Sequence, residues 1–410
     1  MHIRPILSTL RHHKLTAVLL TLQVAVTLAI VCNVMHMIVG RIERINVSTG
    51  IAENELSTIP SETIDKGADH PAQLAADLAA LRAVPGVRAA VAVSYSLPLN
   101  RSEDTHGICP SKEALDRAIQ RNSIDGSGCV EPSVYDGTPG LVGTLGLHLV
   151  EGRDFLPDEY TAHGKPVVAI ITRALAQHLY PGRSALGQSM YDGNQFIRVV
   201  GIVDTLLRPE LRATGVDNDS MILPQAPDGA GALYVLRSAP RDRQRVLVAA
   251  TAALWKANPD RIINSARVRT YSAIRTAYFQ RDITMIGLLI ASVLGLLFVT
   301  ALGIAGLANF WVQQRTRSIG IRRAIGATRG EILRYFQLEN FVIVGTGIVL
   351  GTVLAITLNL VLMKHYELPR LPLGYLPAGA LVLWMLGQLS VLSPALSASR
   401  VPPMVATRSV

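Results

Sequence analysis

Long uncharged apolar runs dominate the hydrophobic pattern of this chain. Four of them reach the length needed to cross a membrane: residues 15–39, 283–312, 341–363 and 375–398. A helix of about 20 residues spans the roughly 30 Å hydrocarbon core of a bilayer. The alternative is a set of buried helices in a large soluble protein, and runs this long and uncharged argue against it. The pattern therefore predicts an α-helical membrane protein with four transmembrane helices, one before and three after a large polar block.

The first apolar run is interpreted as a retained helix rather than a cleaved signal peptide. Basic residues precede it (Arg4, Arg11 and Lys14), as they do in signal peptides. However, the run is too long for a signal core, and no small-x-small cleavage site lies ahead of Arg41.

The block between the first and second runs, residues 40–282, alternates between helical and strand patterns. Periodicity and turn residues predict helices over 71–82, 111–120, 173–179 and 240–258, and strands over 87–97, 165–171, 195–203, 232–237 and 262–268. Residues 41–55 and 271–282 keep a helical composition and are expected to extend the spans as a stalk. The block is therefore expected to form a large α+β domain.

The formal charge of +9 is concentrated in three short segments. Residues 1–14 contribute +3, residues 313–340 contribute +4 and residues 399–410 contribute +2. The block 40–282 nets −1 and the short loop 364–374 nets +1. Because Lys and Arg accumulate on the cytoplasmic side, we expect both terminal tails and the segment 313–340 in the cytoplasm. The block and the short loop then lie outside, and the high pI gives no reason to expect nucleic-acid binding.

The cysteines agree with this topology. Cys32 lies within the first span, where a small buried apolar residue is the simplest interpretation. Cys109 and Cys129 both lie in the external block. Two thiols about 20 residues apart in an oxidising compartment are expected to pair.

Sequence motifs for catalysis are missing. The chain contains no G-x-x-x-x-G-K-S/T phosphate-binding loop, no H-E-x-x-H metal motif and no G-x-S-x-G nucleophile motif. We expect no enzymatic activity and no catalytic, cofactor-binding or metal-binding residues in this chain. His36 is the only titratable side chain in the predicted spans other than Cys32 and tyrosine, which disfavours an ion-coupled carrier.

Small residues recur every four positions in the third span, at Gly347, Gly351 and Ala355. Such spacing can allow two membrane helices to approach closely. The alternative is the ordinary use of small residues in a membrane helix.

The basic segment 313–340 joins the second span to the third and carries six arginines. Ile321, Ala324 and Ile325 recur at helical spacing and predict a short amphipathic helix over residues 317–327, lying along the membrane and ended by Gly326. Thr328 and Glu331 form a T-x-x-E capping box that starts a new helix running into the third span. The six arginines could form a patch that only binds lipid. Alternatively, the arginines together with the apolar stripe could form a surface that binds a partner protein.

This basic segment resembles the signature of MacB/FtsX-type ABC transporter permeases, approximately R-x-x-E-I-G-x-R-R/K-A-L/I-G-A. The match comprises Arg315, Ile319, Gly320, Arg322, Arg323, Ala324, Ile325, Gly326 and Ala327. Ser318 departs from the pattern, because the family usually has Glu there. Residues 145–159 and 166–205 resemble the MacB-like periplasmic core domain, and the short tail after Pro394 resembles the family's basic tail.

The resemblance implies a permease subunit in the bacterial inner membrane with a periplasmic domain. In this family two permeases, identical or sister chains, pair with ATP-binding subunits, and here ATP and Mg would be bound by a separate ATPase. Residues 315–327, including Arg317, Ser318 and Ile321, would form the coupling helix that the ATPase moves. The periplasmic domain would then drive export or efflux of a peptide, drug or lipoprotein, in some systems toward a periplasmic adaptor and an outer-membrane duct.

Three alternatives remain open. An FtsX-like subunit would transmit a signal to a cell-wall enzyme, and a lipoprotein-releasing permease would share the same four-span plan. A membrane-anchored sensor or structural protein would have no ATPase at all.

Overall fold

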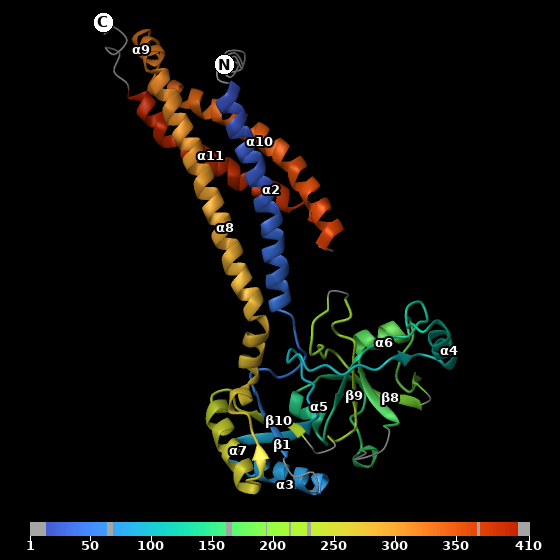
Figure 1. Cartoon of the computed structure of the whole chain (residues 1–410). Coiled ribbons are helices and arrows are strands. Elements are labelled where there is room, and N and C mark those ends of the chain that lie inside the picture. The colour runs from blue at the N-terminus through green and yellow to red at the C-terminus, as the bar shows by residue number, and fades with distance from the viewer. Residues whose placement is uncertain are drawn as a thin grey trace. The chain divides into compact units, whose positions relative to one another are not determined.

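A computed structural model describes residues 14–63, 69–160, 166–193, 195–212, 215–227, 231–366 and 370–400. The chain divides into two compact units, Met1–Asn46 with Arg281–Val410, and Val47–Gln280. We call the first the helical unit and the second the α+β unit (Figure 1). The predicted tails 1–14 and 399–410 lie almost wholly outside the described residues.

Helices make up the described part of the helical unit. They are α2 (Lys14–Ile45), α8 (Tyr271–Gln314, which begins in the α+β unit), α9 (Thr316–Ala324), α10 (Arg329–Tyr366) and α11 (Tyr375–Ser399). By length and composition, α2, α8, α10 and α11 could each cross a membrane, which confirms the predicted one-plus-three arrangement. The short helix α9 lies between the second and third of these helices.

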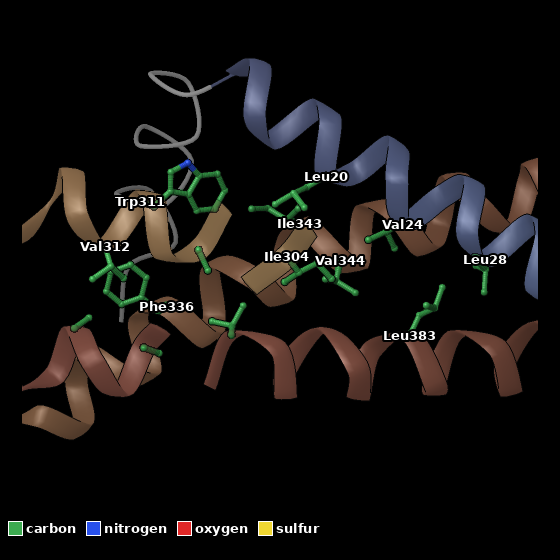
Figure 2. Packing of buried hydrophobic residues seen from close by; sticks show 14 of the residues in the cluster. Leu20, Val24, Leu28, Ile304, Trp311, Val312, Phe336, Ile343, Val344 and Leu383 are labelled. Atoms are coloured by element: carbon green, nitrogen blue, oxygen red, sulfur yellow. The ribbon is translucent and has the colours of Figure 1, made fainter. Parts of the chain in front are cut away.

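Helix α2 packs against α10 and α11 (Figure 2). Leu20, Val24 and Leu28 on α2 share an apolar core with residues of the other two helices. Gly347 and Gly351 on α10 lie directly against α2. A Cβ at Gly347 would lie 2.8 Å from the Val24 Cβ, and one at Gly351 would lie 2.8 Å from the Ala25 carbonyl oxygen.

Polar contacts add to this packing. Ala355, the third small residue of the series, is fully buried, and its carbonyl oxygen accepts a 3.2 Å hydrogen bond from the Asn33 side chain. The hydroxyls of Thr27 and Thr300 lie 2.9 Å apart. The spacing of the small residues thus places backbone against backbone where α2 and α10 meet.

The first sheet of the α+β unit has five strands. Its order is β11 (Arg261–Ile262), β1 (Leu56–Thr63), β10 (Gly231–Ser238) and β2 (Val87–Val93), and β12 (Arg269–Thr270) also pairs with β1. All of these pairs are antiparallel. Helices α3 (His70–Arg82) and α7 (Arg243–Ala257) share an apolar core with one face of this sheet.

The second sheet has seven strands and mixed directions. Its order is β3 (Ile108–Cys109), β7 (Ser189–Asp192), β8 (Gln195–Val203), β6 (Val168–Thr172), β9 (Ser220–Leu223) and β4 (Ser133–Asp136), and β5 (Leu149–Gly152) pairs with β8. The remaining elements of the unit are α4 (Lys112–Arg121), α5 (Leu141–Leu145), η1 (Pro157–Glu159), α6 (Arg173–Leu179) and η2 (Ser265–Arg267). Every residue of β6 is buried, as expected for a β-branched run in the centre of a sheet.

The helical and strand predictions fail at three places. Helix α2 ends at Ile45, so residues 46–55 do not continue the stalk. Within this stretch Gly50 has a φ of +82°, which is incompatible with a helix, and a Cβ there would collide with the carbonyl of Thr205. The strand predicted over 87–97 ends at Val93. The strand predicted over 262–268 is mostly a turn, because the Asn264 side chain accepts the amide of Ala266 and starts η2.

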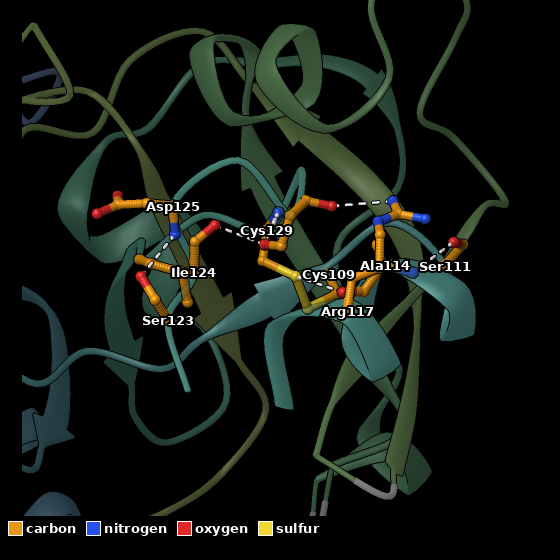
Figure 3. Close-up of a disulfide and its surroundings, with 9 residues drawn as sticks. Cys109, Ser111, Ala114, Arg117, Ser123, Ile124, Asp125 and Cys129 are labelled. Carbon is orange, nitrogen blue, oxygen red and sulfur yellow. Dashed lines mark hydrogen bonds between the residues drawn. A yellow bond between two sulfur atoms is a disulfide. The ribbon is translucent and has the colours of Figure 1, made fainter. Parts of the chain in front are cut away.

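Cys109 and Cys129 form a disulfide, with their sulfurs 2.05 Å apart (Figure 3). The bridge closes a loop that contains α4, whose N-cap Ser111 accepts the amide of Ala114. Arg117 on α4 donates to the Ser127 carbonyl at 2.9 Å, just before the second cysteine. The bridge therefore holds α4 against the edge strand β3.

Candidate functional site

The basic segment forms a compact helix-turn-helix at one end of the helical unit. Helix α8 ends at Gln314, and the non-helical backbone of Arg315 turns the chain into α9. Gly326 has a φ of +105°, a conformation that favours glycine, and it ends the turn after α9. The helix α10 starts three residues later, so α9 is a short separate helix between two long ones.

A buried ion pair ties this turn to α10. The Arg315 guanidinium lies 3.0 Å from the Glu339 carboxylate, and the two side chains are only 14% and 2% exposed. A pair buried this deeply is costly to break, because the partner left behind is an uncompensated charge. The junction between α8 and α9 is therefore fixed to α10 by a specific contact.

Ser318 occupies the position at which the family signature usually has Glu. Its hydroxyl donates a 2.9 Å hydrogen bond to the carbonyl of Arg315, one turn earlier. The serine thus makes a local hydrogen bond to the backbone, and the carboxylate that pairs with the Arg315 side chain is that of Glu339. The matching residues of the signature are brought together in this segment even though Ser318 departs from it.

Helix α9 has one buried face and one open apolar face. Ile319 and Gly320 are buried, and Ile319 shares a core with Phe336 of α10. The predicted apolar stripe points elsewhere: Ile321 is 45% exposed, and Ile325, which directly follows the helix because α9 ends at Ala324 rather than at 327, is 82% exposed. Ala324 is exposed as well. The stripe is therefore available to a lipid surface or to a partner.

Arginines border a cavity beside this helix. The Arg322 guanidinium lies over the ring of Tyr335, 5.1 Å from its centroid. The cavity has a volume of about 390 Å³ and is lined by Arg315, Ser318, Ile319, Arg322, Ala327, Glu331, Ile332, Tyr335 and Phe336. Arg317 is exposed at the start of α9. The surface thus combines positive charge, an open apolar stripe and a recess.

The predicted capping box is formed at the start of α10. The Thr328 amide donates to the Glu331 carboxylate at 2.9 Å, and the Glu331 amide donates to the Thr328 hydroxyl at 3.3 Å. The backbone hydrogen bond from Thr328 is the main cause that lowers the pKa of Glu331. The box fixes where α10 begins and so sets the length of the turn after α9.

Sequence reasoning did not find Glu339 or Tyr335 as partners of the arginines. Both lie on α10, 24 and 13 residues along the chain from their partners. A lone acid at the edge of an apolar run was the available signal for Glu339. Across the described residues, no group of three or more His, Cys, Asp or Glu side chains could hold a metal ion.

Family models match nearly the whole chain. The MacB-like periplasmic core domain matches residues 20–276, and the FtsX-like permease C-terminal domain matches residues 283–403. Together they cover the α+β unit and the three later spans.

Curated relatives are similar over about half of this chain. The macrolide export ATP-binding/permease protein MacB of Sodalis glossinidius is 26% identical over 52% of this chain and 33% of its own length. The uncharacterised ABC transporter permease YknZ of Bacillus subtilis is 26% identical over 52% of this chain and 53% of its own. The pyoverdine export ATP-binding/permease protein PvdT of Pseudomonas aeruginosa is 24% identical over 59% and 37%. The matches thus span between about a third and a half of these relatives.

Among solved structures, the extracellular domain of the ABC-type transporter YknZ from Gram-positive bacteria covers 51% of this chain, at 15% identity and a TM-score of 0.32. All of that domain is matched. The periplasmic region of MacB from Actinobacillus actinomycetemcomitans covers 57% of this chain and 97% of its own, at 12% identity and a TM-score of 0.31. On the two family models that match it, the chain belongs to the ABC transporter permeases with a MacB-like periplasmic core domain and an FtsX-like permease domain.

Proposed function

We propose that this permease relays ATP-driven movement of a separate ATPase to its periplasmic domain, for export or efflux of a peptide, drug or lipoprotein. The protein would lie in the bacterial inner membrane with both termini in the cytoplasm. ATP and Mg would be bound by the partner, and α9 would be the coupling helix that the partner moves.

The observation that carries this proposal is the continuity of α8. It is a single helix of 44 residues, Tyr271–Gln314, which corresponds to about 66 Å at 1.5 Å per residue. Its first residue, Tyr271, is fully buried in the α+β unit and donates a 2.7 Å hydrogen bond to the Pro98 carbonyl. Its last residue is adjacent to the turn that Arg315 and Glu339 fix. A movement of α9 could therefore reach the periplasmic domain along one continuous helix.

A second permease chain is proposed as a further partner. Only 11% of the most apolar stretch of α8 is buried within this chain, against 50% for α2. Leu294 and Phe298 are among the large side chains exposed on it. A helix that must transmit movement is expected to pack against protein rather than only lipid, and a second copy or a sister chain would supply that surface. In an efflux assembly, a periplasmic adaptor and an outer-membrane duct would be further partners.

Charge reversal tests the docking proposal. In Arg322→Glu/Arg323→Glu, we expect loss of ATPase co-purification and of ATPase stimulation by the permease. The matched control is Arg329→Glu/Arg334→Glu, which makes the same change in charge on exposed positions of α10. A patch that only binds anionic lipid would respond equally in both variants. Unchanged ATPase binding in the first variant would refute the proposal.

The identity of the co-purifying proteins separates the alternatives. Mass spectrometry of the complex from the native host should find an ABC ATPase. An adaptor and a duct would favour efflux. An ATPase together with a cell-wall enzyme would favour the signalling role. An ATPase together with lipoproteins alone would favour the lipoprotein-releasing role.

A further inference from the structure

A cavity of about 560 Å³ lies within the α+β unit, against the first sheet. Alternate residues of β1 line it, namely Thr58, Pro60 and Glu62. Their neighbour Ile59 points to the opposite face, into the core beneath α3 and α7. The cavity therefore lies on the sheet face that these two helices leave uncovered.

The wall of the cavity is a strained turn. Leu99 and Arg101 both line it, and both have left-handed backbones, with φ of 62° and 64°. Such conformations are uncommon for residues other than glycine and cost about 1 kcal/mol or more each. Hydrogen bonds hold the turn in place: the Leu99 amide donates to the Arg208 carbonyl at 3.4 Å, and the Arg101 amide donates to the Pro209 carbonyl at 3.1 Å. Strain that the surroundings enforce in this way is typical of ligand-binding segments.

Positive charge gathers around this cavity. Arg101, Arg267 and Arg269 line it together with a single acid, Glu62. The Arg101 guanidinium is stacked 5.3 Å from the centroid of the Tyr278 ring. Arg269 donates a 2.7 Å hydrogen bond to the Ala266 carbonyl, which holds its side chain in place. Among the described residues, Arg267 is exposed and has no ion-pair partner.

The floor of the cavity is apolar. Leu99, Leu233 and Tyr278 are buried there, and Ile274 of α8 is half-buried. Small-molecule sites typically have volumes of roughly 300–1,000 Å³, with apolar walls and a few placed polar groups. Guanidinium groups favour carboxylate and phosphate partners. The combination selects an anion that also carries an apolar body.

We propose that this cavity binds an amphipathic organic anion, one anionic group attached to an aromatic or aliphatic body. The anion would lie between the arginines and the apolar part would rest on Leu99, Leu233 and Tyr278. Because Ile274 and Tyr278 belong to α8, an occupied cavity contacts the helix that we propose as the relay. The role of this ligand as transported substrate rests on the proposed function, whereas the binding itself does not.

The test is a binding measurement on the full-length chain in nanodiscs, without any ATPase. Dansylglycine is the anionic probe and dansylamide is its neutral match, with the signal of empty nanodiscs subtracted. We expect saturable binding of dansylglycine, weakened at least tenfold in Arg267→Ala, which corresponds to 1.4 kcal/mol. Arg245→Ala, on α7 beyond the other face of the sheet, is the control and should bind normally.

Arg101→Gly keeps the test decisive if other variants fold poorly. Glycine accepts the left-handed backbone, which offsets the lost contact between Arg101 and Tyr278, so this variant should fold while it loses binding. Equal binding of both probes, no binding of dansylglycine, or unchanged affinity in both arginine variants would overturn the proposal. The docking variant Arg322→Glu/Arg323→Glu should bind the probe normally, so failure of the ATPase proposal and failure of this one give different results.

Discussion

Replacing Gly351 by alanine places a methyl group in the contact between α10 and α2. The added Cβ would lie 2.8 Å from the Ala25 carbonyl oxygen and 2.9 Å from the Ala25 Cα. Both are backbone atoms, which cannot rotate away as a flexible side chain could. Helix α2 would have to move by about 0.6 Å for the shorter distance to reach 3.4 Å, at which ordinary van der Waals contact begins.

The expected cost follows from two opposing terms. Overpacking of a close contact costs about 1–3 kcal/mol. Alanine recovers up to about 1 kcal/mol because it is the better helix former. Because the clash is with backbone atoms, the upper part of the overpacking range applies, about 2–3 kcal/mol. We therefore expect Gly351→Ala to destabilise the helical unit by about 1–2 kcal/mol. Gly345→Ala is the matched control, because a Cβ at that position of α10 meets nothing within 4 Å.

Cys32 provides the assay. It is the free cysteine of the chain, it lies buried on α2, and Cys109 and Cys129 are held in the disulfide. A thiol-reactive dye applied to the detergent-solubilised protein therefore reports opening of the helix bundle. In Gly351→Ala the labelling rate should rise roughly 5- to 30-fold, as expected for 1–2 kcal/mol. Equal labelling rates in the Gly351 and Gly345 variants would refute the packing argument.

Three further perturbations have expected outcomes. Glu339→Gln should destabilise the helical unit by about 3 kcal/mol, because it leaves the buried Arg315 guanidinium without its counter-charge. Labelling of Cys32 at the wild-type rate would contradict this. The hydrogen bond to Asp192 raises the pKa of His106 above its usual value. Protonated His106 therefore stabilises the folded state. This stabilisation is fully present at low pH and is lost as the pH rises through the raised pKa. Thermal stability should therefore fall less between about pH 6 and 8 in His106→Asn than in the wild type, and parallel pH profiles would exclude that role. Cys109→Ser/Cys129→Ser should lower stability by about 3 kcal/mol, as loop closure predicts, whereas an unchanged unfolding midpoint would show that the bridge is dispensable.

The parts of the structure predicted from sequence are those set by local patterns. Long uncharged runs define the spans, because the thickness of the bilayer fixes their length. The capping box needs only Thr328 and Glu331, three residues apart. The end of the stalk was not predictable from composition, because residues 41–55 have a helical composition although Gly50 adopts a left-handed backbone.

Contacts between distant segments were beyond sequence reasoning. The pairing of Arg315 with Glu339 depends on how α8 and α10 approach each other, which no local pattern specifies. The left-handed backbones of Leu99 and Arg101 have no sequence signal, since neither residue favours that conformation. The cavity beside them depends on strand pairing and on the start of α8, so it also required the structure.

Photo-crosslinking from α9 tests most directly the claim that this helix contacts an ATPase. A benzoylphenylalanine at Ile325, whose side chain is 82% exposed, would be activated in membranes of the native host. The same group at Leu350, exposed on the membrane-spanning part of α10, is the control. The account predicts an adduct between position 325 and an ABC ATPase, identified by mass spectrometry, and none from position 350. Adducts with lipid alone from both positions would contradict it.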